Sequence, residues 1–297
     1  MLWENLREEE FESAIERSGR LCIIPLGCME KHGQHLPMGT DSYIAKTITE
    51  KACEQEEVMI FPAGMWLGEV SCFHSEDDPK SSRLRGCIGI NPTTLLLILE
   101  ELCDEIARNG FDKILIANSH GGNVPMLSYF VRAQCYKKKD YATMWTWANL
   151  DEEMTPEAIM KLHQARPDDF AMLTDDDITT LKGYLGTNYG GGHADMREAA
   201  LLMCNYPELV SSDSFETESG FSIHRADYLY KEGIDFGHAW ISNYPNAYSA
   251  LPPHGCSQTI GEAMVKIAAE RMARIFKLLK NDDDCVRMAK HEPQPIN

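Results

Sequence analysis

Short apolar runs recur along the first half of the chain, and each is bounded by glycine, proline or charged residues. Runs of this length with few polar positions are typical of strands that are buried on both faces of a sheet. They predict strands over residues 20–26, 58–62, 113–118 and 141–147.

Stretches with helical spacing lie between and after these runs. Asn91 and Pro92 are typical of a helix start and Gly110 of a helix end, so one helix is expected between them. Periodicity predicts further helices over residues 7–18, 41–55, 125–138, 193–205 and 257–280.

Strands that alternate with helices of this length indicate β-α-β units and a mainly parallel sheet with helices on both faces. The acidic stretch 151–180 is expected to hold a surface helix and a loop, and the charged tail from residue 281 to be mobile. We find no repeat or low-complexity linker, so a single domain over residues 1–297 is expected. Residues 62–91 lack periodicity, and long excursions of this kind are often functional.

Composition narrows the possible partners. The net charge of −18 argues against nucleic acid and anionic membranes as partners. The N-terminus lacks a signal-peptide core, and no window approaches the roughly 18 apolar residues of a membrane span, so a cytoplasmic protein is expected. The ten cysteines show no regular spacing and are interpreted as scattered small core residues.

Three polar segments carry the residue types of metal and proton-transfer chemistry. The first two follow predicted strands, where ligands of an open parallel sheet bind. Glu30 and His32 are two apart in extended backbone, so both can reach one centre. His193 and Glu198 are five apart in a predicted helix and are expected to diverge. The segments are IIPLGCMEKHGQHLPMGTD (23–41), SHGGN (119–123) and HADMRE (193–198).

Carboxylates and imidazoles crowded beyond a buried strand destabilise a fold unless a cation holds them. This mixed nitrogen and oxygen set suits Zn²⁺ or Mn²⁺ and exceeds what one catalytic zinc takes while keeping a position open. Two ions are therefore expected, which would lower the pKa of bound water to roughly 7, and a remaining histidine is free to transfer protons. The expected ligands are Glu30, His32, Asp41, His120 and Glu198.

Some of these residues have simpler interpretations. Asp41 would otherwise serve as the N-cap of the next helix, and it could do both. His35 is expected to shape the loop or to support a ligand. His74 is either a substrate contact or an ordinary loop residue. Trp147 is expected to pack, unless its place at a strand end puts it over the substrate.

The three segments resemble the signatures of a known family. GCMEKHGQHLPMGTD closely resembles the Glu-x-His-Gly-x-His-Leu-Pro-x-x-Thr-Asp signature of the creatininase family, NSHGGN matches its second signature and HADMREAAL is similar to its third. The resemblance spans roughly residues 20–205. It implies a three-layer α/β/α sandwich, often assembled as a hexamer, and two divalent ions per subunit.

Position by position, the resemblance implies that Glu30 and His120 bind one ion, that His32 and Glu198 bind the other, and that Asp41 bridges them. His193 falls where the family has its catalytic histidine, which donates a proton to the leaving group. The resemblance further implies that water activated by the ions is the nucleophile.

The chain departs from creatinine hydrolases on the substrate side. They have a metal-binding Glu where this chain has Gly122, so the chain resembles the His-Gly-Gly-Asn branch, in which the third-signature Glu takes that role. Tyr189 replaces a substrate-contacting Trp. The loop at His74 begins as expected and then continues as a polar stretch through Arg83 and Arg85.

The resemblance implies hydrolysis of a small cyclic substrate, in the first instance the C–N bond of a creatinine-like cyclic amide. The expected substrate contacts are His74, Gly121, Tyr189 and Trp147. The alternatives on the same metal centre are ring opening of an oxidised inositol, such as 3-dehydro-scyllo-inosose, and deformylation of a formamide. A binding protein without catalysis is a further hypothesis, against which the retained ligands and His193 argue. The aromatic stretch after residue 205 fits a subunit interface or a pocket.

Overall fold

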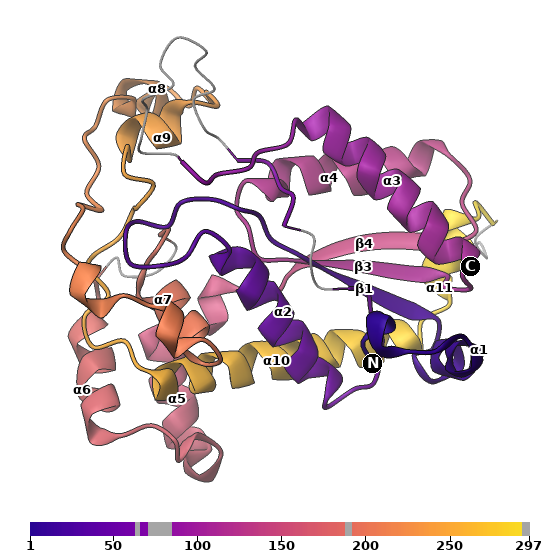
Figure 1. The fold of residues 1–297 in the computed structure, drawn as a ribbon, viewed down its shortest axis with the longest axis horizontal. Helices are drawn as coiled ribbons and strands as arrows, with labels where there is room; N and C mark the ends of the chain where they lie inside the picture. Colours follow the sequence, from indigo (N-terminus) through magenta and orange to yellow (C-terminus); the bar gives the residue numbers. More distant parts are fainter. Residues whose placement is uncertain (63–65, 71–84, 188–191, 293–297) are drawn as a thin grey trace, which may run out of the picture.

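The structure, a computed structural model, describes residues 1–62, 66–70, 85–187 and 192–292. Parallel strands in the spatial order β2-β1-β3-β4 form the sheet of this part of the chain (Figure 1). The predicted strands are confirmed, although the second comprises only two residues. The bounds are β1 (Leu21–Leu26), β2 (Met59–Ile60), β3 (Lys113–Asn118) and β4 (Ala142–Trp147).

The register of the sheet aligns the ends of three strands. Leu26 lies opposite Asn118, and Asn118 lies opposite Trp147. Because the strands are parallel, their carboxyl ends meet at one edge of the sheet. The polar segments that follow β1 and β3 therefore start side by side, as the sequence predicts.

Helices cover both faces of the sheet (Figure 1). Side chains alternate along β1, because Leu21 and Ile23 join one apolar cluster while Cys22 and Ile24 join the other. The predicted α/β class, with a parallel sheet between helical layers, is confirmed. One layer contains α2 (Thr40–Cys53) and α10 (Gln258–Lys280), and the other contains α1 (Glu8–Arg17), α3 (Pro92–Arg108) and α4 (Asn123–Ala133).

The remaining helices differ in part from the prediction. The helix expected over 125–138 ends at Ala133 and continues as a 3₁₀ turn. Two α-helices, rather than the one expected, start within the stretch 151–180. Within the tail, whose expected mobility stays a prediction, residues Asp284–Ala289 form a short helix that contacts β4. The α-helices are α5 (Pro156–Ala165), α6 (Asp175–Tyr184), α7 (Met196–Met203), α8 (Asp227–Lys231), α9 (Ala239–Asn243) and α11 (Asp284–Ala289). The 3₁₀ turns are Trp3–Asn5, Gln134–Tyr136, Asp151–Glu153, Pro167–Phe170, Pro207–Leu209 and Ser212–Ser214.

Side-chain caps fix where several of these helices begin. Asn91 accepts a hydrogen bond from the Thr93 N–H at 2.9 Å, and Pro92 follows as the first helical residue of α3. Ser257 caps α10, accepting from the Ile260 N–H at 3.1 Å. Each cap satisfies a backbone donor that has no partner within its helix.

Asp177 joins α6 to the start of α10. Its Oδ2 accepts hydrogen bonds from the Thr174 N–H at 2.8 Å and from the hydroxyls of Thr174 and Thr259 at 2.7 Å each. Its Oδ1 accepts a short hydrogen bond from the Ser257 hydroxyl. One carboxylate thus ties two helix starts together from within the fold.

Across the described residues, none of the helices combines the length and the apolar character that crossing a membrane requires.

Candidate metal centre

The loop that follows β1 is extended at the residues that carry chemistry. Met29 pairs with Ile88 in an antiparallel bridge. Alternate residues of extended backbone point the same way, so Glu30 and His32 share one face of the segment. Gly33 then turns the chain with φ +60°, a backbone conformation that residues other than glycine rarely adopt.

The turn between β3 and α4 presents His120 to this loop. Asn118 Nδ2 donates to His120 O at 2.8 Å. Asn123 Nδ2 donates at 3.1 Å to the carbonyl of Gly27, the first residue after β1. His120 Nε2 lies 2.6 Å from Glu69 O. A Cβ at Gly122 would lie 2.5 Å from His120 Nε2, so a side chain does not fit there.

The five expected metal ligands converge at this edge of the sheet. His120 Nδ1 lies 3.1 Å from Glu30 Oε1 and 3.0 Å from Asp41 Oδ2. His32 Nε2 lies 3.3 Å from Asp41 Oδ1 and 3.7 Å from Glu198 Oε2. The two oxygens of Asp41 therefore face two different imidazoles, which is the arrangement a bridging carboxylate requires. Asp41 is the second residue of α2 and not its N-cap, which is Gly39.

The hydrogen bonds of the imidazoles fit a metal site. His32 Nδ1 is 3.0 Å from Glu30 O, and His120 Nε2 is 2.6 Å from Glu69 O, so each ring is oriented by donating its N–H to a carbonyl. The other nitrogen of each ring then carries a lone pair that faces the carboxylates. His32 Nε2 is fully buried and has no hydrogen-bond partner in the described part of the chain. A divalent cation satisfies such an atom, so the donor set fits Zn²⁺ or Mn²⁺.

Electrostatics point the same way. Burial raises the pKa of the Asp41 carboxyl, but the imidazoles of His32 and His120 outweigh burial and hold that pKa well below its usual range. Burial lowers the pKa of His32, but the carboxylates of Asp41 and Glu198 outweigh burial and raise this pKa to about 10. The carboxylates thus attract any positive charge at this point, and a cation competes with the imidazole protons for the same lone pairs.

Glu198 is supplied by the start of α7. Asp195 is the N-cap and accepts from the Glu198 N–H at 2.9 Å, while Glu198 Oε2 accepts from the Ala194 N–H at 2.7 Å. Ala194 has φ +60°, a turn that directs the chain into the helix. Arg197 Nη2 lies 3.6 Å from Glu198 Oε1, and Nη1 of the same guanidinium pairs with Asp151. Both oxygens of Glu198 are therefore held in place.

His193 lies before α7 in extended backbone, paired with Ser249. The prediction that the helix starts at His193 is wrong, because α7 starts at Met196. His193 Nδ1 is 3.4 Å from Glu30 Oε1, and its ring centroid is 4.1 Å from that of His32. His193 Nε2 is 2.8 Å from Lys31 O, so the Nδ1 atom faces the carboxylates. Its side chain is 14% exposed against 0% for His32, so it still reaches the cavity.

Among the described residues, three overlapping groups of side chains have ligand atoms within 4.8 Å of one another: Cys28, Glu30, Asp41 and His120; Glu30, His32 and His193; His32, Asp41 and Glu198. Sequence reasoning placed all ten cysteines in the core and so missed Cys28. Its sulfur lies 3.1 Å from Asp41 Oδ2. The spacing Cys28-x-Glu30 in extended backbone was the signal that could have found it.

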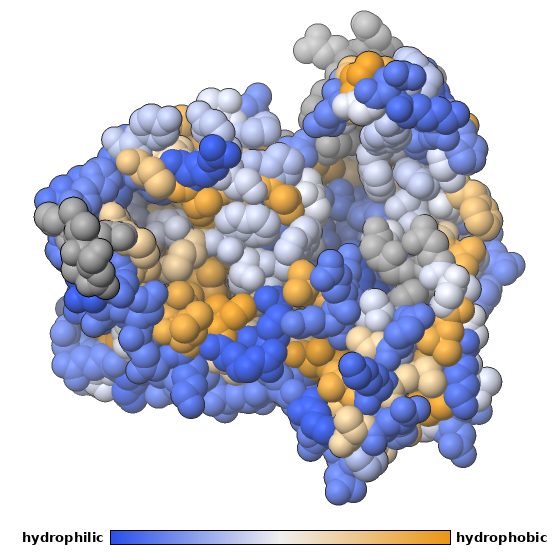
Figure 2. All heavy atoms as spheres, turned by 180° about the vertical axis from the view of Figure 1, so that it is seen from behind, coloured by the Kyte–Doolittle hydropathy of each residue, from blue (hydrophilic) through white to orange (hydrophobic). Residues whose placement is uncertain are grey.

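A cavity of about 810 Å³ opens onto this cluster. From behind, the molecule is hollowed between the arm that carries α8 and α9 and the side formed by α3 and α4 (Figure 2). Gly121 and Trp147, two of the residues predicted to contact substrate, line the cavity. The predicted contacts His74 and Tyr189 lie outside the described residues.

One wall of the cavity lies in the region after residue 205, whose aromatic stretch the sequence left open as a subunit interface or a pocket. It comes from α8, α9 and the segment between them, more than a hundred residues after the second signature. The aromatic content of this region was the only signal in the sequence. Its lining residues are Tyr230, Asp235, Phe236, Gly237 and Trp240.

Comparison with known proteins gives consistent matches. The sequence matches the Creatininase family model, described as creatinine amidohydrolase, over residues 4–276. The creatinine amidohydrolase of Pseudomonas putida is 21% identical over 209 residues, or 69% of this chain and 72% of that protein. A mycofactocin precursor peptide peptidase of Mycobacterium tuberculosis is 30% identical over 108 residues, or 36% of this chain and 42% of that protein.

Solved structures resemble the fold as well. A structure of creatinine amidohydrolase (creatininase) has a TM-score of 0.65 at 17% identity and covers 95% of this chain and 98% of its own. A creatininase named for manganese has a TM-score of 0.64 at 17% identity, covering 95% of this chain and 99% of its own. A mutant creatininase of Zn-Zn type has the same score and identity, covering 95% and 98%. At this identity the likeness establishes the fold.

Proposed function

The chain belongs to the creatininase family, and we propose that it is a divalent-metal-dependent hydrolase that cleaves an amide C–N bond at a two-ion centre. The observation that carries this proposal is the geometry of Asp41. Its Oδ2 faces His120 at 3.0 Å and its Oδ1 faces His32 at 3.3 Å, with a further carboxylate on either side. Two adjacent ion positions that share one carboxylate are the simplest account of this arrangement.

Glu30, His120 and Asp41 would hold one ion, and His32, Glu198 and Asp41 the other. Three carboxylates offset most of the four positive charges of the pair. When bound, such ions supply a nucleophilic hydroxide at neutral pH and polarise the carbonyl of the substrate.

His193 is the residue we propose for proton transfer. Its Nε2 is directed to the Lys31 carbonyl, which leaves Nδ1 facing Glu30 and the cavity. As a general acid, His193 would donate a proton from Nδ1 to the leaving nitrogen of an amide bound in the cavity. Removal of this imidazole would leave the carboxylates and their metal affinity in place.

The first substrate to test is creatinine, as the representative of small cyclic amides. Protein loaded with Mn²⁺ or Zn²⁺ is incubated with creatinine, and products are identified by mass spectrometry beside metal analysis of the same samples. Creatine formed at an enzymatic rate, and lost in Asp41→Asn, supports the proposal. The absence of product from protein that holds two ions per chain rejects creatinine but not the metal centre.

Cleavage of a peptide amide is the second candidate, and the size of the cavity favours it. A volume of about 810 Å³ is in the range of pockets that enclose ligands much larger than creatinine. Tyr230, Phe236 and Trp240 make one wall of the cavity aromatic, which suits apolar side chains of a peptide. A mycofactocin precursor peptide peptidase is among the relatives. Mass spectrometry of a short-peptide library tests this candidate. A library that stays intact after incubation with protein loaded with Mn²⁺ or Zn²⁺ rejects it.

Ring opening of an oxidised inositol and deformylation of a formamide, the alternatives that the resemblance implies, are the next assays. Arg83 of the polar stretch lies outside the described residues. A cytoplasmic homo-oligomer, with a hexamer favoured, also remains a prediction. Light scattering coupled to size-exclusion chromatography tests the oligomer.

A further inference from the structure

Cys28 is buried without being part of the apolar core. Its side chain is 0% exposed, yet it belongs to none of the apolar clusters formed by the described residues, which do include Cys22 and Cys103. Its neighbours are two carboxylates and an imidazole, and its sulfur is 3.1 Å from Asp41 Oδ2. Packing alone therefore does not explain where this thiol lies.

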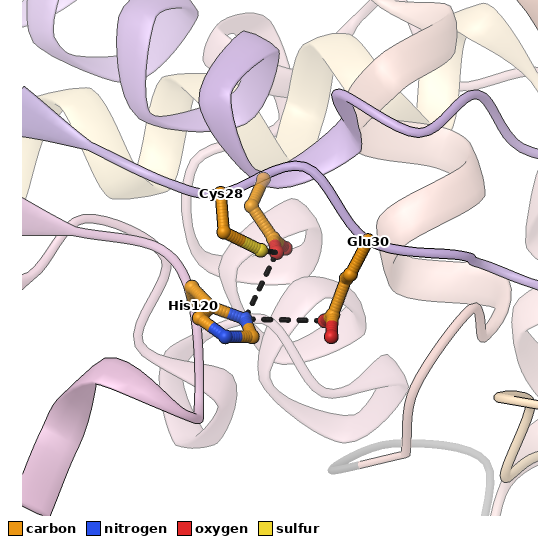
Figure 3. A group of neighbouring side chains, drawn as sticks. Cys28, Glu30 and His120 are labelled. Atoms are coloured by element: carbon orange, nitrogen blue, oxygen red, sulfur yellow. Dashed lines mark hydrogen bonds and ion pairs between the residues drawn. The ribbon is translucent and has the colours of Figure 1, made fainter. Parts of the chain in front are cut away.

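Backbone geometry directs the sulfur at the cluster. Cys28 and Glu30 are alternate residues of the extended loop after β1, and both project toward His120 from the neighbouring turn (Figure 3). Gly68 closes the opposite side, because a Cβ there would lie 2.6 Å from Cys28 Cβ. The thiol is thus confined next to the carboxylates.

The spacing of the donor atoms matches one ion. Zinc binds sulfur at about 2.3 Å and nitrogen or oxygen at about 2.0–2.2 Å, so the ligand atoms of a tetrahedral site lie roughly 3.3–3.6 Å apart. Here His120 Nδ1 lies 3.1 Å from Glu30 Oε1 and 3.0 Å from Asp41 Oδ2, and Asp41 Oδ2 lies 3.1 Å from Cys28 Sγ. All four atoms lie within 4.8 Å of one another. Small outward shifts would let a single ion contact all of them.

We propose that Cys28 is a fourth protein ligand of the ion held by Glu30, Asp41 and His120. This inference rests on the proposed metal centre. A thiolate is a soft ligand that favours zinc over manganese, so this position would prefer zinc, whereas the position at His32 and Glu198 has only nitrogen and oxygen donors. Binding of the ion releases the thiol proton to solvent.

Cobalt substitution tests the proposal, because Co²⁺ bound to thiolate absorbs in the near ultraviolet through charge transfer. The full chain is titrated with Co²⁺, and bound cobalt is counted by elemental analysis. Wild type and Cys135→Ser, which removes an exposed thiol, are expected to show the band. Cys28→Ser is expected to bind cobalt without the band and to lose at least 10-fold in zinc affinity at one site, comparable to the loss of a supporting residue.

Cobalt-loaded wild type that lacks the band would overturn the proposal and leave the metal centre intact, with Cys28 donating its S–H to Asp41 as a positioning residue. Failure of wild type to bind cobalt or zinc at all would overturn the metal centre itself. X-ray absorption of the zinc-loaded wild type provides a measurement that does not depend on the folding of a variant. A sulfur neighbour at about 2.3 Å supports the proposal, and a shell of only nitrogen and oxygen rejects it.

Discussion

Gly261→Ala tests how closely α10 must approach the helix that supplies Glu198. Gly261 lies in the first turns of α10, against α7. A Cβ at this position would lie 1.9 Å from Ala200 O and 2.8 Å from Ala200 C, where contacts under 3.0 Å are essentially never observed. The contacting atoms are backbone atoms, so they cannot rotate away, and the two helices would have to separate by about 1 Å.

The cost follows from packing. A gap of about 1 Å forfeits a quarter to a half of the dispersion attraction across an interface, and overpacked sites typically lose about 1–3 kcal/mol. Alanine gains about 1 kcal/mol over glycine in helix propensity, which does not offset a clash with backbone. Taking the upper end of the overpacking cost less the gain in helix propensity, we expect Gly261→Ala to lower the free energy of unfolding by about 2 kcal/mol. At roughly 2 °C per kcal/mol for a chain of this size, Tm falls by about 4 °C.

Gly183→Ala is the matched control. Gly183 is an exposed glycine of α6, and a Cβ there would meet no atom within 4 Å. It should leave Tm unchanged or raise it slightly through helix propensity. Thermal unfolding of the metal-free proteins is followed by circular dichroism. Metal content is measured on separate metal-loaded samples, because a displaced α7 should weaken the binding of the ion at Glu198. A Gly261→Ala protein that melts at or above the control would refute the reasoning.

Three further variants test the site and the fold. Glu198→Gln is expected to lose about one ion per chain while keeping its circular dichroism spectrum, and full occupancy by elemental analysis would contradict its role. His193→Ala should retain its metal and lose at least about 100-fold in kcat, whereas parental turnover would contradict proton transfer. Asp177→Asn should lose about 2 kcal/mol at pH 7, because several hydrogen bonds to a charged group weaken. Burial raises the pKa of the Asp177 carboxyl, but hydroxyl donors lower it to a net value below its usual range. Its contribution is therefore present above about pH 4 and is lost as pH falls through the depressed pKa, so urea unfolding should show a gap to wild type that narrows in acid, and a constant gap would exclude the charge as its cause.

The strands and the first two ligand segments were predictable because their signals are local. A buried parallel strand such as Lys113–Asn118 is a continuous apolar run, and its end is marked where polar residues begin. The alternation of Glu30 and His32 in extended backbone also held. Parallel topology then placed His120 beside them without further information, since Leu26 and Asn118 are in register.

The errors have a common physical cause. The helical spacing over 193–205 concealed that Asp195 caps the helix, so that His193 lies outside it and turns back toward His32. Cys28 has the composition of a core residue, and only its neighbours show that it faces carboxylates. In both cases the local pattern was correct for most of the segment and wrong at the residue that carries chemistry.

By itself, the sequence determined the elements, the parallel sheet and the identity of most candidate ligands, because these depend on interactions within a few residues or on the alternation of side chains along one strand. Only the tertiary structure decided that Asp41 faces two imidazoles, that Glu198 reaches His32 from α7, and that Trp240 lines the cavity. Those contacts join segments far apart in the chain. Their geometry is set by how helices pack on the sheet, and no local pattern encodes the distance of that approach.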